Sequence, residues 1–456
     1  MQLNISPRPW VKIPVEIAAR ELEAKLFLTH VLARKGWGVL IGQENLVRSA
    51  IATSVSGIQY DKSIAAGMKK YLMEAQSRGD YFTAHCEEGL VYLDPQTYIR
   101  RKICPANFMA ADAFFFWGNQ QYGDVTTALN IDYPHTITGN PRIDLLRKDM
   151  QNCYKDSSTW LKNKLGEFIL INTKFGRYNP FIGREIFYQQ AKGAWGIIKT
   201  PAEDEKFRAS VKQQEFMYHK TLHLIDRLAK EFSSQKIVIK PHPAENWFPY
   251  VQRYANAANI HVAMHGASNQ WLAAAQQVIH NSCTTGIEAF LLGKPVYSYE
   301  PYEDTSQDAE LPALLSTRIK TEDELMESIV NAPPVNDREK RNKLAEEYMA
   351  NLSEDMAAVR IANHFNTLIP PIKKVTFAVR HMLCLSEINT HHTENSHYWL
   401  EASYGTRQDY KMQKFPAFTT ATVAGTLQRF SQVLESIEDM TVAEVEPNLF
   451  CVYSNI

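Results

Sequence analysis

The sequence lacks the features that are typical of membrane proteins, secreted proteins and proteins stabilised by a structural metal or by disulfides. No apolar run approaches the length of a membrane span, and residues 1–25 soon become an amphipathic charged segment, so we expect no secretory signal. Only six cysteines occur in 456 residues, none in CxxC spacing. That scarcity argues against a zinc site and gives no support to a disulfide framework. We therefore expect a cytoplasmic protein.

An excess of charge of either sign is also missing. The chain has 49 basic and 50 acidic residues, a formal net charge of -1. This balance gives no sign of a nucleic-acid partner, which would need a basic surface. Internal repeats and low-complexity segments are absent as well. A charged ligand would therefore have to be bound by a few local residues.

The chain does have apolar content, 45% over 456 residues, which is enough to bury the cores of two or three domains. In the first third, short apolar runs alternate with segments of helical period, such as Val11–Ile17 before Ala18–Arg34 and Gly57–Tyr60 before Lys62–Ser77. This alternation predicts a parallel sheet covered by helices. Gly139-Asn140-Pro141 then interrupts it. We predict a first α/β domain over residues 1–150.

The alternation of strands and helices restarts after a charged helical stretch, Arg142–Lys164. A second α/β domain is predicted over residues 151–368, with strands at Glu167–Asn172, Lys236–Ile239, Ile260–Ala263, Gln277–His280 and Pro295–Tyr299, and closing helices at Thr321–Ile329 and Asp337–Thr367.

Residues 369–456 are expected to form a C-terminal extension of unknown role. Within it, Lys373–Ile388 has the pattern of a basic amphipathic helix, which suggests peripheral contact with a membrane. Gln428–Ile437 is predicted as another helix, and Val442–Tyr453 as partly strand. A partner or core helix remains the alternative for Lys373–Ile388.

Polar residues follow the predicted strand Lys236–Ile239, in the sequence Lys240-Pro-His242-Pro. Parallel sheets bind ligands beyond the carboxyl ends of their strands, and a cation beside an imidazole suits a phosphate or carboxylate. The alternative is a proline-terminated strand with a solvated lysine and a capping histidine.

A second polar group follows the strand Gln277–His280. Ser282, Thr284 and Thr285 cluster where a helix begins, and free amides at a helix N-terminus favour an anion. Glu288, one turn on, could accept hydrogen bonds from a ribose. Asn172 and Lys174 end a neighbouring strand and could also meet phosphate. An ordinary Ser/Thr cap with a dipole-compensating glutamate is the alternative.

Together these two motifs resemble the nucleotide-binding half of GT-B glycosyltransferases. More narrowly, they are similar to bacterial enzymes that use CMP-activated acidic sugars, namely sialyltransferases, Kdo transferases and surface carbohydrate biosynthesis proteins, and CDP-glycerol polymer transferases share part of the pattern. The resemblance covers Val11–Leu368. It implies an α/β protein with two Rossmann-like domains facing a central cleft, with the nucleotide-sugar held by the second.

The resemblance also suggests where the chemistry lies. Cys86-Glu87-Glu88-Gly89 is similar to the acidic motif of bacterial sialyltransferases, in which one carboxylate is the general base. Adjacent side chains diverge, so one of the two would serve, and we favour Glu87. Gly139-Asn-Pro-Arg-Ile-Asp144 resembles a motif of surface polymer transferases, which implies Asp144 as a carboxylate nucleophile. The alternatives are solvated carboxylates at 87 and 88 and a helix-dipole role for Asp144.

These inferences combine into one hypothesis. The chain would move Kdo or a related acidic sugar from CMP to a glycan or glycolipid acceptor of a surface polysaccharide, with retention of configuration. Lys240, His242 and the hydroxyl cluster would stabilise the departing CMP without a metal or other cofactor. The alternatives are a CDP-glycerol or CDP-ribitol phosphotransferase, a UDP-sugar epimerase or transferase, and a binding subunit without activity.

Overall fold

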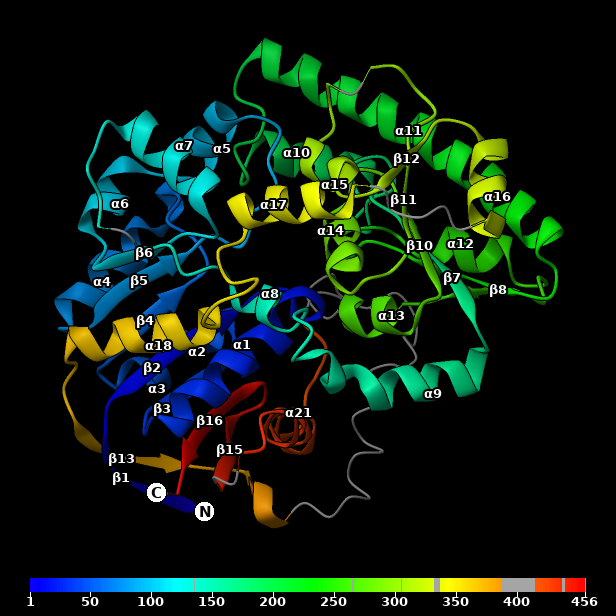
Figure 1. Ribbon diagram of the computed structural model, residues 1–456. Coiled ribbons are helices and arrows are strands. Elements are labelled where there is room, and N and C mark those ends of the chain that lie inside the picture. Colours follow the sequence, from blue (N-terminus) through cyan, green and yellow to red (C-terminus); the bar gives the residue numbers. More distant parts are fainter. Residues whose placement is uncertain are drawn as a thin grey trace. The chain divides into compact units, whose positions relative to one another are not determined.

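The computed structural model describes residues 1–134, 136–264, 266–304, 306–331, 337–387, 415–436 and 439–455. These residues form two compact units (Figure 1). Unit 1 contains the described residues of 1–153, 339–387 and 415–455, and unit 2 contains those of 154–338. The described part of unit 2 is thus continuous in sequence, whereas unit 1 is assembled from distant parts of the chain.

Unit 2 is built on a six-stranded parallel sheet with the order β12-β11-β10-β7-β8-β9. Its central strands carry almost uninterrupted apolar sequences, as expected for strands buried on both faces. The strands are β7 (Phe168–Asn172), β8 (Lys236–Lys240), β9 (Ile260–Val262), β10 (Gln277–His280), β11 (Val296–Tyr299) and β12 (Thr317–Ile319). The order reverses between β7 and β10, which in a doubly wound sheet is the point where ligands bind.

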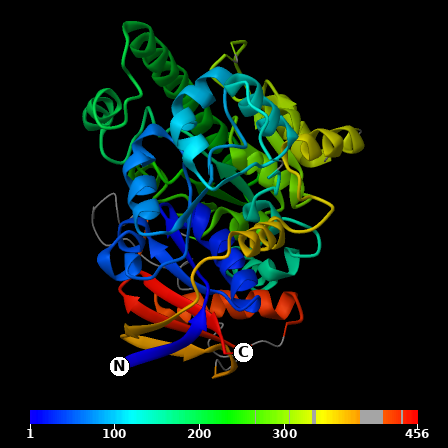
Figure 2. The same cartoon turned by 90° about the vertical axis from the view of Figure 1, so that its left-hand side faces the viewer.

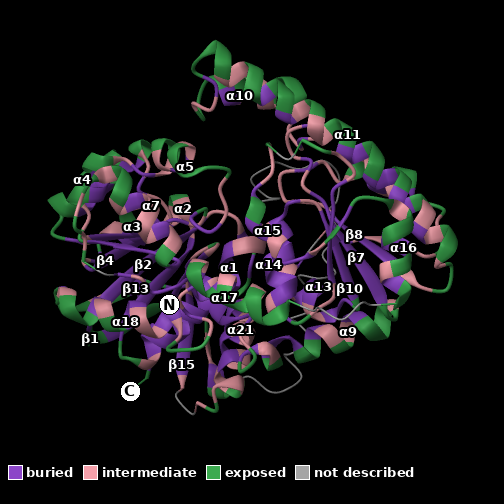
Figure 3. Cartoon of the chain, turned by 45° about the horizontal axis from the view of Figure 1, so that its top comes forward, coloured by how far each residue is buried: buried purple, intermediate pink, exposed green. Residues whose placement is uncertain are grey.

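The two faces of this sheet differ in what they bury. One face packs Ile169, Ile171, Ile237 and Ile279 into a hydrophobic core with the long helix α11 (Pro201–Glu231). Figure 3 shows these strands as buried and much of α11 as exposed on its outer side. The remaining helices of unit 2 are α9 (Lys155–Leu165), α10 (Arg184–Lys192), α12 (Phe248–Arg253), α13 (Ser268–Ala274), α14 (Thr284–Leu291), α15 (Glu310–Leu314) and α16 (Glu322–Asn331).

Unit 1 contains an eight-stranded mixed sheet with the order β14-β15-β16-β3-β2-β4-β5-β6. Its parallel part, β3 to β6, comes from the first third of the chain and reverses its order at β2, again a topological switch point. The strands are β2 (Trp10–Val15), β3 (Gly38–Gln43), β4 (Ile58–Asp61), β5 (Tyr81–His85) and β6 (Ala113–Phe115). The helices that follow them include α1 (Ala18–Arg34), α2 (Glu44–Val47), α3 (Ala50–Thr53), α4 (Lys69–Ser77), α5 (Pro95–Lys102), α6 (Pro105–Ala110) and α7 (Asn119–Leu129).

The C-terminal residues complete unit 1. β14 (His381–Cys384), β15 (Met440–Glu446) and β16 (Leu449–Ser454) extend the sheet antiparallel, with β16 beside β3, and α21 (Thr420–Val433) packs against α1. Both chain ends lie at the lower end of the molecule in Figures 1 and 2, and Arg8, at the end of β1 (Gln2–Arg8), donates a hydrogen bond to Ser454 O at 2.9 Å. Residues 369–456, expected as an extension, therefore supply part of this unit's core, while residues 388–414 lie outside the described residues.

The helix expected at Lys373–Ile388 is wrong. β13 (Lys373–Ala378) pairs with β1 (Gln2–Arg8) in a two-stranded antiparallel sheet, β14 follows, and a single 3₁₀ turn ends the segment. Phe377 is buried while its neighbours Thr376 and Ala378 are not, an alternation of period two that the helical interpretation overlooked. The membrane contact inferred from that helix loses its basis.

Two long helices expected from the sequence are interrupted. Arg142–Lys164 contains α8 (Pro141–Asp144), a 3₁₀ turn and α9, and Asp337–Thr367 contains α17 (Arg338–Tyr348) and α18 (Ala357–Leu368). α18 packs on α1 in unit 1, although the sequence had placed it in the second domain. None of the described helices combines the length and the apolar character needed to cross a membrane.

Candidate functional site

Two candidate side chains of unit 2, Asn172 and Lys240, lie in one row with His280 at the carboxyl edge of its sheet. In the strand register, Asn172 of β7 is paired with both Lys240 of β8 and His280 of β10. Paired residues of parallel strands project to the same face. This face is opposite to the isoleucine-rich one, and it carries polar groups where the sheet order reverses.

Lys240 is buried at this edge, with 6% of its surface exposed and its ammonium over the ring of Trp271 at 5.7 Å. Burial lowers the pKa of Lys240 to about 7, because a charged ammonium loses its hydration there. An anion next to it would restore the charged form. The residue is therefore suited to a ligand that brings negative charge.

The turn after Lys240 is organised by Glu245, a residue that the sequence analysis did not select. Its fully buried carboxylate accepts hydrogen bonds from the Thr173 hydroxyl at 2.8 Å, the Phe175 amide at 2.7 Å and the Tyr250 hydroxyl at 2.9 Å. The His242 amide donates a fourth, longer one at 3.3 Å. Glu245 thus fastens the loop after β7 to the loop after β8. Its place three residues after His242 was the only signal in the sequence.

The same turn fixes the imidazole of His242. The amide of Ala244 donates to His242 Nδ1 at 3.1 Å, so a neutral ring carries its proton on Nε2. The side chain is half-buried. His242 therefore presents an N–H donor, which is the group that a phosphate or a departing oxyanion requires.

Ser282, between β10 and α14, has an unusual backbone. Its φ is 44°, in the left-handed region that costs a residue with a Cβ about 1 kcal/mol or more. Its hydroxyl donates to Ala309 O at 3.2 Å, and its carbonyl accepts from Lys174 Nζ at 2.7 Å. Lys174 therefore spans the switch point from β7 to β10, and the backbone turns sharply just before the N-terminus of α14.

Two buried oxygens at this edge have no hydrogen-bond partner within the described parts of the chain. They are Oδ1 of Asn172 and Oγ1 of Thr285, on residues that are 5% and 7% exposed. Buried polar atoms are nearly always paired, so these two indicate a bound water or ligand. Thr284, at the start of α14, is half-buried, and Glu288, one turn further, is 8% exposed.

His280 has a structural position beneath this edge. Its Nε2 lies 2.8 Å from Ser316 Oγ and its Nδ1 accepts from the Cys283 amide at 3.3 Å, and burial lowers its pKa to about 3. A Cβ on Gly286 would come within 2.2 Å of this ring. The glycine in Thr-Thr-Gly-Ile-Glu288 is thus explained by the neutral His280 on which the helix rests.

The acidic motif of unit 1 follows β5 at the carboxyl edge of the parallel strands. Glu88 is exposed and pairs with Lys102, whereas the Glu87 side chain is 9% exposed and has one carboxylate oxygen 3.5 Å from Lys25 Nζ. The second oxygen, Oε2, lacks a hydrogen-bond partner among the described residues. Of the two candidates, Glu87 is the nearly buried one, with one oxygen near a lysine and the other available to a ligand.

Lys25 is held in turn by Glu21. Its ammonium donates to Glu21 Oε2 at 2.9 Å and to Pro14 O at 2.7 Å, and Arg20 lies 3.2 Å from Glu21 Oε1. Burial raises the pKa of Glu21, but Lys25 and Arg20 outweigh it and hold this pKa well below its usual range. Arg20 and Glu21 thus belong to a charged network that ends at Glu87.

Asp144 is enclosed completely. Its carboxylate accepts hydrogen bonds from the Asn351 amide at 2.5 Å and from the backbone amides of Ala357 at 2.8 Å and Ala358 at 2.9 Å, the first residues of α18. Burial raises the pKa of Asp144 to about 6, although the hydrogen bonds from these donors act to lower it. This placement favours the helix-dipole alternative over a nucleophile, with the dipole belonging to α18 rather than to α8.

The rest of the Asp144 motif serves the same packing. Gly139 has a φ of 74°, and a Cβ there would come within 2.0 Å of Asn351 Oδ1. Asn140 caps α8 by accepting from the Arg142 amide at 2.9 Å. In the sequence Gly-Asn-Pro-Arg-Ile-Asp, the glycine leaves room for Asn351 and the aspartate caps the N-terminus of α18.

No three His, Cys, Asp or Glu side chains gather as metal ligands would in the described segments. What the unit 2 edge offers is a set of donors: the Lys240 ammonium, the Nε2–H of His242 and the N-terminus of α14. The unit 1 edge offers a carboxylate, Glu87. Donors of this kind suit an anion with several oxygens, and a carboxylate suits a hydroxyl that must lose its proton.

Comparison with known proteins identifies the type of fold. No protein-family model and no curated protein sequence matches the chain. Among solved structures, wall teichoic acid polymerase TagF soaked with CDPG is similar at a TM-score of 0.50 and 9% identity, over 78% of this chain and 88% of that one. A UDP-GlcNAc 2-epimerase from Methanocaldococcus jannaschii in complex with UDP-GlcNAc and UDP is similar at 0.46 and 10% identity, over 78% and 99%. The chain has an α/β fold of the GT-B type, with two Rossmann-like units, and at these identities the likeness is one of fold.

Proposed function

We propose that the chain is a transferase that binds a nucleoside diphosphate-linked substrate at the carboxyl edge of the unit 2 sheet. The observation that carries the proposal is that three donors follow the strands that flank one switch point. They are the buried ammonium of Lys240 and the Nε2–H of His242 after β8, and the α14 N-terminus behind the strained Ser282 after β10. Neutral sugars or peptides would not require such a collection of donors.

The unpartnered oxygens of Asn172 and Thr285 indicate which other groups the ligand would carry. Asn172 Oδ1 can only accept, and Thr285 Oγ1 can donate or accept, so the ligand would carry hydroxyl or amide groups beside its phosphates. A nucleotide with a ribose and a base has both. Lys174 and Glu288, assigned to donor binding from the sequence, are retained in the proposal.

During transfer, negative charge develops on the departing phosphate. Lys240 and the Nε2–H of His242 would stabilise this charge, since both are donors that follow β8 at this edge of the sheet. Glu87, with its unpartnered Oε2, is proposed as the base that takes the proton of an acceptor hydroxyl. Asp144 has no part in the proposal, because its carboxylate is occupied by α18.

The substrate class is a CDP-linked alditol or a UDP-linked sugar. Structures of similar fold were solved with CDPG and with UDP-GlcNAc, which supports this class over a CMP-linked acidic sugar. The acidic-sugar hypothesis came from the motif resemblance, and only its retaining mechanism relied on Asp144. Isothermal titration calorimetry with CDP, UDP and CMP tests the class, and CDP or UDP is expected to bind more tightly than CMP. Tighter binding of CMP, or none of any nucleotide, would contradict the proposal.

Lys240 provides a matched pair of variants. Lys240→Met is expected to weaken binding of the preferred nucleotide roughly tenfold or more, because a charge-assisted hydrogen bond is lost. Lys236, at the opposite end of the same strand, donates to Ala258 O at 2.6 Å, and Lys236→Met serves as the control. Equal affinities for the two variants would remove Lys240 from the site.

The pKa of Lys240 gives the same titration a pH signature. Since burial lowers this pKa to about 7, much of the ammonium is deprotonated above pH 7, and a bound phosphate would raise the pKa again. Binding at pH 8 should therefore take up a proton, seen as a binding enthalpy that differs between Tris and HEPES buffers. The uptake should vanish in Lys240→Met and persist in Lys236→Met.

A further inference from the structure

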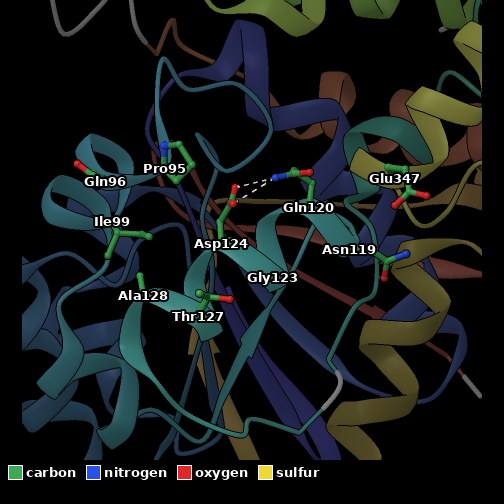
Figure 4. Close-up of a pocket in the computed structure, with 10 residues that line it drawn as sticks. All are labelled: Pro95, Gln96, Ile99, Asn119, Gln120, Gly123, Asp124, Thr127, Ala128 and Glu347. Carbon is green, nitrogen blue, oxygen red and sulfur yellow. Dashed lines mark hydrogen bonds between the residues drawn. The ribbon is translucent and has the colours of Figure 1, made fainter.

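Unit 1 contains a groove that the proposed function does not use. It lies between α5 and α7, has a volume of about 380 Å³, and is lined by Pro95, Gln96, Ile99, Asn119, Gln120, Gly123, Asp124, Thr127, Ala128 and Glu347 (Figure 4). α5 follows β5 and α7 follows β6, so the groove starts from the same sheet edge that carries Glu87. A cavity of this size accommodates a small ligand.

The lining of the groove has no cationic side chain. Its polar groups are the amides of Gln96, Asn119 and Gln120, the hydroxyl of Thr127 and the carboxylates of Asp124 and Glu347, with no lysine, arginine or histidine among the ten lining residues. Phosphates are bound most strongly by cations, and the two carboxylates of this lining would repel them. Amides and hydroxyls can donate or accept and carboxylates accept, so the lining suits a neutral ligand with many hydroxyl groups.

Asp124 is already set in position at the centre of the groove. Gln120 Nε2 donates to its two oxygens at 3.1 and 3.2 Å, as Figure 4 shows, and the Tyr92 hydroxyl donates to Oδ2. The ring of Tyr92 stacks on Tyr98 at 4.5 Å, which fixes the tyrosine as well. A carboxylate that is pre-oriented in this way loses little side-chain freedom when a ligand binds.

The wall formed by α7 contains a glycine that packing does not require. A Cβ on Gly123 would meet nothing within 4 Å, and the residue lies in the middle of an 11-residue helix. Glycine in a helix interior is unfavourable relative to alanine, so its presence here lowers the stability of α7. What it does provide is a flat surface beside Asp124, where a ligand can approach the helix backbone.

From these observations we propose that the α5–α7 groove binds a neutral saccharide, one that belongs to the acceptor of the proposed transferase. Only the identification of this saccharide as an acceptor rests on the proposed function. Pre-oriented Asp124, Gln120 and Asn119 would bind its hydroxyls, and the bare backbone at Gly123 would contact a sugar ring. Because the groove begins at the edge of Glu87, a saccharide chain lying in it would extend away from the proposed base.

The experiment measures saccharide binding by the full chain with saturation-transfer NMR. The probes are three neutral trisaccharides, triacetylchitotriose, maltotriose and cellotriose, with spermidine and glucose 6-phosphate as cationic and anionic comparisons. At least one neutral trisaccharide is expected to bind. Gly123→Ala should weaken that binding about tenfold, since a single methyl group in a pocket changes affinity by this order. Asp124→Asn should weaken it as well.

The alanine variant also separates a binding defect from a folding defect. Gly123→Ala should raise Tm by about 2 °C, because alanine is the better helix former. Gly425, inside α21, also has no atom within 4 Å of an added Cβ, so Gly425→Ala should raise Tm equally and leave binding unchanged. Binding of spermidine alone, of no neutral probe, or of the same probe equally by Gly123→Ala would overturn the proposal. CDP and UDP affinities, measured in the same variants, should not change, so failure here is distinct from failure at the nucleotide site.

Discussion

Glu245 is the single residue on which most of the unit 2 edge depends. Its carboxylate joins the loop after β7, through Thr173 and Phe175, to the loop after β8, through His242. Neither loop has regular secondary structure, so this buried group helps to position Lys174 and His242, together with the contacts of Lys174 to Ser282 O and of His242 to the Ala244 amide. Burial raises the pKa of Glu245 to about 7, which makes its charge sensitive to pH in the neutral range.

Replacing Glu245 should separate charge from geometry. Glu245→Ala leaves several buried donors without an acceptor and should lower the free energy of unfolding by about 3 kcal/mol, and it should also weaken nucleotide binding. Glu245→Gln keeps an oxygen for Thr173 and Phe175 and should retain binding. Urea denaturation and calorimetry measure the two effects. An alanine variant with wild-type affinity would show that the loops do not need this residue.

The sign of the pH effect follows from the raised pKa. Between about pH 4.5 and 7 the folded chain binds more protons at Glu245 than the unfolded chain does, so this residue's contribution to stability falls as pH rises through that window. Glu245→Gln has no such proton. Its stability relative to the wild type should therefore increase from pH 5 to pH 8, and a constant difference would contradict the assigned shift.

Among the elements, α18 depends on an unusual cap. Its N-terminal amides donate to Asp144, which lies 213 residues before Ala357 in the sequence. The cap therefore ties the first third of the chain to the segment that returns from unit 2. α18 also packs on α1, so loss of the cap would loosen the layer that covers the sheet of unit 1.

Asp144→Asn distinguishes a cap from a nucleophile. Asparagine can still accept from the amides of α18, so the variant should turn over substrate at close to the wild-type rate while its stability falls by about 1 kcal/mol. Asp144→Ala should fall further. Turnover of the identified substrate and thermal unfolding give the two readouts. Loss of turnover with unchanged stability would return Asp144 to the chemistry.

The sequence was most informative where strands were apolar and helices periodic. The strands at Lys236–Ile239 and Gln277–His280 lie within a residue of β8 and β10, because buried parallel strands have no polar interruptions. β13 and β1 were missed or taken for helix, since their short alternating patterns only become apparent once the two are paired. Ranges that look continuous, such as Asp337–Thr367, were broken by tertiary contacts that no local pattern reports.

For the candidate site, the sequence indicated the strand ends but not what each side chain does there. Lys240, Asn172 and Ser282 stand where the motif suggested. Glu245 looked like an ordinary loop residue, because its partners at 173 and 175 are distant in sequence. Asp144 looked catalytic for the converse reason, since the helix that uses it begins at residue 357. The assignments of Glu87, His242 and the donor-binding residues remain predictions.

At the scale of the whole molecule, the C-terminal strands are expected to decide whether unit 1 is stable. β16 is buried throughout and pairs with β3, so a chain that ends at Glu387 would expose the edge of β3 and lose the cover of α21. Differential scanning calorimetry should show the transition of unit 1 abolished or greatly lowered. Unit 2, which has its own core, should keep its transition and its nucleotide binding. Unchanged unfolding of both units would contradict this.

The pairing of Gly42 with Leu449 also has a consequence for biosynthesis. Unit 2 is continuous and can complete its sheet while the ribosome is still at work, whereas the first strands of unit 1 must wait until the last ones emerge. Throughout that interval β3 has an open edge, ready to pair with another nascent chain. We therefore expect the sheet of unit 2 to form before that of unit 1, and we expect the yield in a cell to depend on chaperones that protect the first third of the chain.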